Sequence, residues 1–197
     1  MAFKREFEIK SIPVDEVLRY MRAGKTPDEG IIDVVKSACE SVIRASKCVA
    51  CYITLPLTVH GSVVTLGTLE LESKSLSSHL DGCTQAVIFC ASAGVGVDRE
   101  IQKKGAVSAL GALACDCAGS ALVEEICDRF EEEILGDFST TRRFSPGYGD
   151  LSIEYQRDMV ALLDTKKHIG VSITDGLMMT PTKSVTAIIG IKKKELK

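Results

Sequence analysis

The fold is decided by residues 107–135, which read VSALGALACDCAGSALVEEICDRFEEEIL. Apolar side chains recur along this stretch at helical spacing and cover much of the helix circumference, whereas acidic side chains gather toward its C-terminal half. Gly111, Gly119 and many alanines leave room for another backbone to approach closely, and Gly136 is expected to end the helix. The pattern predicts a long central helix that packs against a sheet.

Strand patterns lie on both sides of this helix. The best buried strand is predicted over residues 85–93, QAVIFCASA, because the run is apolar and has the length of a strand. The other predicted strands cover residues 49–55, 63–71, 171–174 and 184–191. Strands and helices do not alternate regularly, which argues against a doubly wound parallel sheet. We therefore expect one α+β domain over residues 1–197, in which the C-terminal strands join the sheet that contains residues 85–93.

Several shorter helices are predicted from their start signals. A helix that ends near Ser46 is expected to begin with a capping box, in which Thr26 is the N-cap and Glu29 the acid three residues later. A helix that reaches Leu163 is expected to be capped by Ser152 or Asp150. A first helix over residues 14–22 and a helical turn over residues 164–170 complete the set.

A glycine loop, residues 93–98 with the sequence AGVGVD, lies between a predicted strand and a predicted helix. Such a loop can hold a phosphate group at the helix N-terminus. Here it lacks the third glycine of a dinucleotide-binding fingerprint. The alternative is a tight turn in which Asp98 caps the following helix.

Composition and charge exclude several classes of protein. The chain has 24 Lys and Arg against 27 Asp and Glu, a balance that argues against electrostatic binding of nucleic acid or of an anionic membrane. Aromatic residues make up 5% and Trp is absent, so a stacking platform for single-stranded bases is not expected. The N-terminus is charged and no apolar run has the length of a membrane span. We expect a cytoplasmic protein whose eight cysteines are mostly free thiols and whose Lys-rich C-terminus is a solvated tail.

The segment RRFSPGYGD, residues 142–150, has the features of a ligand loop. Pro146 and Gly147 fit the central positions of a type II turn. Arg143 supplies a planar fork that suits a carboxylate, and Tyr148 supplies an aromatic face with a hydroxyl group. A small zwitterion with a flat ring would fit such a loop. The alternative is a surface loop held by an arginine–acid pair.

At these residues the sequence resembles the activation (reactivation) domain of cobalamin-dependent methionine synthase. The family's Arg-x-x-Pro-Gly-Tyr signature is matched by Arg143, Pro146, Gly147 and Tyr148. A Lys-x-x-Gly turn follows at residues 167–170, and a Met-x-Pro-x-x-Ser-Val element follows at residues 179–185. The resemblance is clearest over about residues 106–191.

The resemblance implies a fold, a ligand and a role. The fold would be a twisted, mainly antiparallel sheet with the long helix packed on it, and the ligand would be S-adenosylmethionine in a shallow groove. Its methyl group, together with one electron from a flavodoxin-like donor, would return oxidised cob(II)alamin to methylcobalamin. By this resemblance Arg143 pairs with the ligand carboxylate, the backbone of Ser145 holds the adenine end, and Tyr148 lines the site beside the Pro146–Gly147 turn.

Two departures from the family matter. Ser120 stands where the family has a glutamate that contributes to the site, and Glu124 follows one turn later. Both are therefore included among the candidate ligand-binding residues. The chain also lacks the Asp-x-His-x-x-Gly corrinoid motif and the cysteine pattern of a homocysteine zinc site. Any cobalamin would have to come from a partner, namely a methionine synthase or another corrinoid protein.

The cysteines offer a rival interpretation. Cys48 and Cys51, taken with Cys115 and Cys117, supply enough sulfur for a tetrahedral zinc ion, and the first pair has the spacing of a redox motif. Neither pair has the tight turns of a zinc ribbon, and Cys117 occupies a core position of the long helix. We therefore expect buried thiols and neither a metal ligand nor a catalytic residue in the chain itself.

Two classes of function remain after these observations. The first is an accessory protein of methyl transfer, which binds S-adenosylmethionine and serves a separate corrinoid protein. The second is a binding subunit that keeps the fold but not the ligand. Binding of S-adenosylmethionine separates the two.

Overall fold

The centre of the molecule is strand β5 (Cys83–Ser92), which pairs along its length with β2 (Val49–His60) on one side and β8 (Ser184–Lys192) on the other. The computed structural model describes residues 1–192, and the C-terminal lysines that follow lie outside the described part. The sheet has six strands in the order β4-β3-β2-β5-β8, with β1 also paired to β2, and every pairing is antiparallel. The remaining strands are β1 (Phe3–Glu6), β3 (Val63–Leu66) and β4 (Leu69–Glu72).

Both faces of this sheet are buried, which explains why β5 reads as a continuous apolar run. Its side chains alternate between the faces, so that Val87 and Phe89 contribute to one core and Ala86 and Ile88 to the other. The first core is closed by α1 (Val14–Tyr20), α2 (Glu29–Ala45), α4 (Val95–Gly105) and α5 (Ala109–Phe130). The second is closed by the β3–β4 hairpin, α3 (Lys74–His79), α6 (Tyr155–Leu163) and α7 (Thr165–Ile169).

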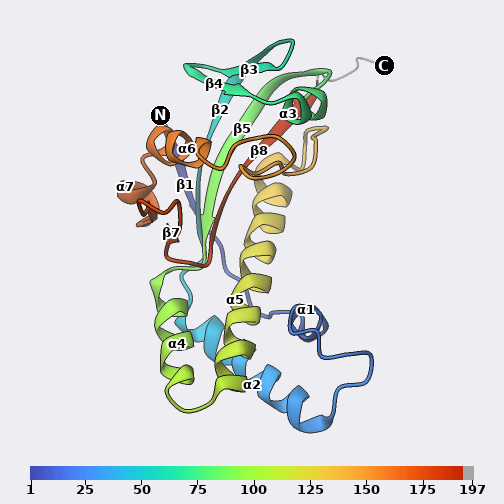
Figure 1. The fold of residues 1–197 in the computed structure, drawn as a ribbon, viewed down its shortest axis with the longest axis vertical. Coiled ribbons are helices and arrows are strands. Elements are labelled where there is room, and N and C mark those ends of the chain that lie inside the picture. The colour runs from blue at the N-terminus through green and yellow to red at the C-terminus, as the bar shows by residue number, and fades with distance from the viewer. Residues whose placement is uncertain (193–197) are drawn as a thin grey trace.

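The long helix α5 is the central helix that the sequence predicts. Its C-terminal end lies on the sheet, where the ring of Phe130 stacks on Phe89 with centroids 4.6 Å apart and meets Tyr52 edge-on at 5.2 Å. Its N-terminal end extends past the sheet and packs between α2 and α4 (Figure 1). The helix then continues as a π-helical turn, η1 (Glu131–Leu135), and ends at Gly136 as expected. The predicted α+β fold is confirmed, and in the described residues no helix is long and apolar enough to cross a membrane.

The predictions of the strands need three corrections. Residues 63–71 form a hairpin, β3 and β4, and not one strand, because Gly67 takes a positive φ of 62° and turns the chain. Strand β2 also extends to His60, where β3 pairs with its last residues. The predicted strand 171–174 also does not join the main sheet, because β6 (Ser172–Ile173) pairs with β7 (Met179–Thr180) in a separate two-stranded sheet.

The helix caps also differ from the prediction. Asp28, and not Thr26, caps α2, since its carboxylate accepts a hydrogen bond from the Ile31 amide at 2.9 Å. Asp150 does not cap α6. Its carboxylate instead accepts hydrogen bonds at the start of α3, from the Ser73 hydroxyl and from the amides of Lys74 (2.9 Å) and Ser75 (3.0 Å). These bonds hold the pKa of the Asp150 carboxyl well below its usual value, and they fasten the 142–150 loop to the second core.

Both glycines of the loop before α4 are required by the fold. Gly94 takes a φ of 83°, which favours glycine, and a Cβ on Gly96 would collide with the carbonyl oxygen of Ala45 at the end of α2. Asp98 does not cap α4, because its carboxylate accepts hydrogen bonds from the amide (2.9 Å) and hydroxyl (2.6 Å) of Thr182. The loop therefore joins α4 to α2 and to the turn before β8.

Candidate functional site

The chain between η1 and α6 runs along the outer edge of β8, and this placement orients the candidate ligand loop. Thr141 donates its amide to the Gly190 carbonyl at 2.9 Å, and Phe144 exchanges two backbone hydrogen bonds with Ile188, each 2.9 Å long. Phe144 packs into the second core. Because neighbouring side chains of an extended segment point to opposite faces, Arg143 lies on the other face, toward α5.

The predicted type II turn forms at Pro146 and Gly147. The Tyr148 amide donates to the Ser145 carbonyl at 3.0 Å, and Gly147 takes the required positive φ, at 92°. Pro146 is buried, whereas Tyr148 is 58% exposed and meets the Phe144 ring edge-on with centroids 6.0 Å apart. The turn therefore presents Ser145 and Tyr148 at the surface beside Arg143.

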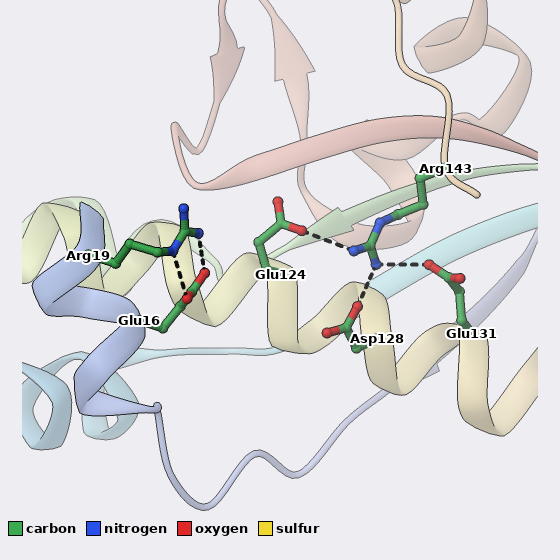
Figure 2. Close-up of polar contacts among 6 residues, drawn as sticks. All are labelled: Glu16, Arg19, Glu124, Asp128, Glu131 and Arg143. Carbon is green, nitrogen blue, oxygen red and sulfur yellow. Dashed lines mark hydrogen bonds and ion pairs between the residues drawn. The ribbon is translucent and has the colours of Figure 1, made fainter.

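Arg143 is held by three carboxylates on one face of α5 and η1 (Figure 2). Its Nη2 lies 3.0 Å from Glu124 Oε2, while its Nη1 lies 2.9 Å from Asp128 Oδ1 and 2.8 Å from Glu131 Oε1. The acids are spaced by four and three residues, which places them on the same side of a helix. We call this group the Arg143 cage. All three acids belong to the chain itself, so the structure contains the arginine–acid pairing that the sequence analysis gave as the alternative to a ligand loop.

Burial distinguishes Glu131 from the other two acids. Its side chain is 30% exposed, against 48% for Glu124 and 65% for Asp128. Burial raises the pKa of the Glu131 carboxyl above its ordinary value; Arg143 opposes this effect, and the charges of Asp128 and Glu124 add to it. The next residue inward, Cys127, has a thiol whose pKa burial raises to about 12. Glu131 is therefore the most buried acid of the cage, and its burial favours the protonated form.

Two adjoining hollows line this face of α5. One, of about 310 Å³, is bordered by Glu124, Arg143, Ser145 and Tyr148. The other, of about 290 Å³, is bordered by Tyr20, Ser120, Glu124 and Lys183. Glu124 and Val185 border both, so the two form one groove between α5 and the start of β8. The structure thus brings together five of the seven predicted site residues, while Pro146 and Gly147 shape the loop without lining the groove.

The far half of the groove contains an ion pair that the sequence analysis missed. Lys183 Nζ lies 2.8 Å from Asp116 Oδ1 and donates to the Ser120 hydroxyl at 3.0 Å, and its side chain is 12% exposed. Tyr20 of α1 closes this end, with Arg19 stacked on its ring at 4.7 Å. Arg19 in turn pairs with Glu16 of the same helix (Figure 2). Ser120 is therefore bonded to Lys183 in this structure.

The proposed zinc arrangement of cysteines is wrong. Cys48 belongs to the first core and Cys51 to the second, so the two thiols lie on opposite faces of the sheet. Burial raises the pKa of all eight thiols, which disfavours the thiolate form that binds metal or reacts. Within residues 1–192 no group of three His, Cys, Asp or Glu side chains is arranged to hold a metal ion.

Comparisons with known proteins agree with the fold. Residues 128–195 match the family model "Vitamin B12 dependent methionine synthase, activation domain". Among solved structures, the crystal structure of the MetH reactivation domain bound to AdoHcy has a TM-score of 0.64 at 12% sequence identity, over 100% of this chain and 80% of that one. No curated protein sequence matches the chain. The chain therefore has the fold of the MetH reactivation domain, and its C-terminal third matches the activation-domain family of vitamin B12-dependent methionine synthase.

Proposed function

We propose that this chain binds S-adenosylmethionine in the groove between α5 and the Arg143 loop. We further propose that it supplies the methyl group for reductive reactivation of a cobalamin carried by a separate methionine synthase or corrinoid protein. The observation that carries the proposal is the meeting of Arg143, Ser145 and Tyr148 with Glu124 around one groove. These residues come from segments about twenty positions apart, and most of them fall where the sequence matches the activation-domain family.

The residues of the groove suit an amino-acid end joined to a nucleoside. The guanidinium of Arg143 offers paired N–H donors to a carboxylate. The carboxylate of Glu124 would face the ammonium and sulfonium charges, and the exposed Tyr148 ring would lie against the nucleoside. The partner's cobalamin would supply the reduced cobalt that accepts the methyl group, after one electron from a flavodoxin-like donor. In this role the chain is an accessory of a methyltransferase, acting as one domain over residues 1–197 in the cytoplasm.

Calorimetry with S-adenosylmethionine tests the proposal directly. The full chain is expected to bind one molecule, and Tyr148→Ala is expected to weaken binding because the ring borders the groove. Ile153→Ala is the matched control, since Ile153 is an exposed apolar residue near the same turn that does not border the groove. Absence of binding by the wild-type chain would contradict the proposal.

One observation favours a second candidate, a binding subunit that keeps the fold without the ligand. In this structure all of Arg143's carboxylate partners come from α5 and η1, and Ser120 is bonded to Lys183. A subunit that binds no ligand does not need the N–H donors of Arg143 to be available for a ligand carboxylate. The same calorimetry separates the candidates, because this one predicts no binding of S-adenosylmethionine at any pH.

A further inference from the structure

The Arg143 cage leaves no unoccupied terminal nitrogen for a ligand carboxylate. Nη2 is bonded to Glu124, and Nη1 is shared between Asp128 and Glu131. Bidentate recognition of a carboxylate needs two parallel N–H donors of the guanidinium. A ligand carboxylate that binds end-on to both terminal nitrogens needs an N–H group of Nη1, which already contacts two acids, so it must displace Asp128 or Glu131.

The negative charges around Arg143 make replacement of a cage acid by the ligand carboxylate unfavourable unless a proton is taken up. The charged and titratable groups around Arg143 are Glu124, Cys127 and Asp128 on α5, Glu131 on η1, and Arg142 and Tyr148 on the loop; β8 contributes the apolar Val185. The Cys127 thiol stays neutral at physiological pH because burial raises its pKa to about 12. A ligand carboxylate would be the fourth acid around one guanidinium, and like charges at this distance disfavour ionisation of one of them.

Glu131 is the acid of the cage best placed to be neutralised. It is the least exposed of the three, and it lies on the π-helical turn, where the i→i+4 pattern of α5 is already interrupted. Glu124 and Asp128 are more exposed, so water stabilises their charges after Arg143 moves. Glu131 would lose its partner in a half-buried position, where the protonated form is favoured.

We propose that Glu131 is a positioning residue that holds Arg143 in the ligand-free groove and takes up a proton when the ligand carboxylate replaces it. This inference rests on the proposed function, because it describes how that same groove admits its ligand. It implies that affinity for carboxylate-bearing ligands increases as the pH falls, because the ligand-bound chain holds one more proton than the ligand-free chain.

The test is calorimetric titration of the chain with S-adenosylhomocysteine. Repeating the titration in buffers of different ionisation enthalpy counts the protons that are taken up or released on binding. The wild-type chain is expected to take up protons on binding at about pH 6. Glu131→Gln removes the charge that competes for Arg143, so it should bind about fivefold more tightly and lose the proton uptake. The matched control is Glu132→Gln, because Glu132 is an exposed neighbour that pairs with Arg129.

A second ligand tests whether Glu131→Gln changes the groove in general or only its binding of a carboxylate. 5′-Deoxy-5′-methylthioadenosine keeps the nucleoside and the sulfur but has no carboxylate, so its affinity should be the same for the wild type and Glu131→Gln. If Glu131→Gln does not fold, Asp128→Asn, at a more exposed position, is expected to tighten binding in the same direction.

The outcomes separate this inference from the proposed function. Tighter binding by Glu131→Gln with loss of proton uptake supports the proposed role of Glu131. If the wild type binds without taking up protons and Glu131→Gln binds equally well, that role is overturned and the proposed function still stands. Absence of binding by the wild type, Glu131→Gln and Asp128→Asn overturns both.

Discussion

Phe144 and Ile188 exchange two backbone hydrogen bonds of 2.9 Å, and this pair fixes the position of the candidate ligand loop on the sheet. Through it, the loop extends the sheet by a short stretch beyond β8, with Phe144 in the second core and Arg143 over α5. The orientation of Arg143 therefore follows from the pleat of the sheet as well as from its ion pairs.

Replacement of Arg143 should affect both ligand binding and stability. Charge-assisted bonds contribute roughly 1.5–3 kcal/mol, so Arg143→Ala should weaken S-adenosylmethionine binding by about ten- to a hundredfold. Arg143→Lys should recover part of this loss, because an ammonium group cannot form the bidentate pair. Arg143→Ala should also lower the free energy of unfolding, since it leaves three acids clustered without a cation.

The control for this prediction is Arg142→Ala, because Arg142 borders the groove but belongs neither to the signature nor to the cage, so its removal should cost much less. Calorimetry measures the binding and urea denaturation measures the stability. An affinity that Arg143→Ala leaves unchanged would place the ligand elsewhere.

Replacement of Asp150 should reveal a pH-dependent contribution to stability. The hydrogen bonds from the start of α3 lower the pKa of Asp150 in the folded state, so its contribution is present above the unfolded pKa and is lost as the pH falls. Asp150→Asn should be less stable than the wild type at neutral pH, and the difference should shrink below about pH 4. Urea denaturation at several pH values measures this, with Asp137→Asn, at an exposed position nearby, as the control.

Two helical glycines should respond oppositely to alanine. A Cβ on Gly96 would collide with the Ala45 carbonyl oxygen, so Gly96→Ala should destabilise the chain by about 1–3 kcal/mol. A Cβ on Gly105 would meet Ala112 at an ordinary 3.7 Å, so Gly105→Ala should be neutral or stabilising by up to about 1 kcal/mol. Thermal or urea denaturation of both variants checks this, and equal effects would mean that α2 and α4 are not in close contact.

Truncation of Phe130 should show that α5 is anchored on the sheet. Phe130 is fully buried and stacks on Phe89, so Phe130→Ala should lower the free energy of unfolding by about 3–5 kcal/mol. Phe138→Ala removes the same side chain from a half-exposed position after η1 and should cost much less. Similar losses in the two variants would contradict the packing described for the first core.

The thiols should be unreactive until the chain unfolds. Seven of the eight cysteines are buried and Cys83 is intermediate, so Cys83 should be modified first in the native protein. All eight should react in denaturant, because none is paired in a disulfide. Titration with a thiol reagent counts them in both states. Early modification of Cys48 together with Cys51 would contradict their placement on opposite faces.

Local signals in the sequence predicted much of this fold. The buried strand, the long helix and the Pro146–Gly147 turn each depend on the residues of one segment, and each is confirmed. The capping of α2 was misplaced because Thr26 and Asp28 both have side chains that can cap, and sequence spacing did not decide between them. Gly67 was interpreted as an interruption within a strand, although its positive φ makes it the turn of a hairpin.

The candidate site was predictable from the loop but not from its surroundings. The signature residues indicated Arg143. Asp128 and Glu131 were missed, because their contact with Arg143 depends on how the loop runs along the edge of β8. Their spacing from Glu124, four and then three residues, is the signal that would have placed them on one helix face. Lys183 was missed for the same reason, since its partners lie more than sixty positions earlier in the chain.

The short stretch of loop along β8 has a consequence for self-association. β8 is the last strand in the order of the main sheet, and its middle is apolar, so an uncovered outer edge would offer backbone donors and acceptors to the same strand of another molecule. Thr141 and Phe144 occupy part of that edge with their own hydrogen bonds. The segment that orients the candidate ligand-binding arginine therefore also shields the chain from edge-to-edge aggregation, and substitutions that detach it should reduce solubility as well as binding.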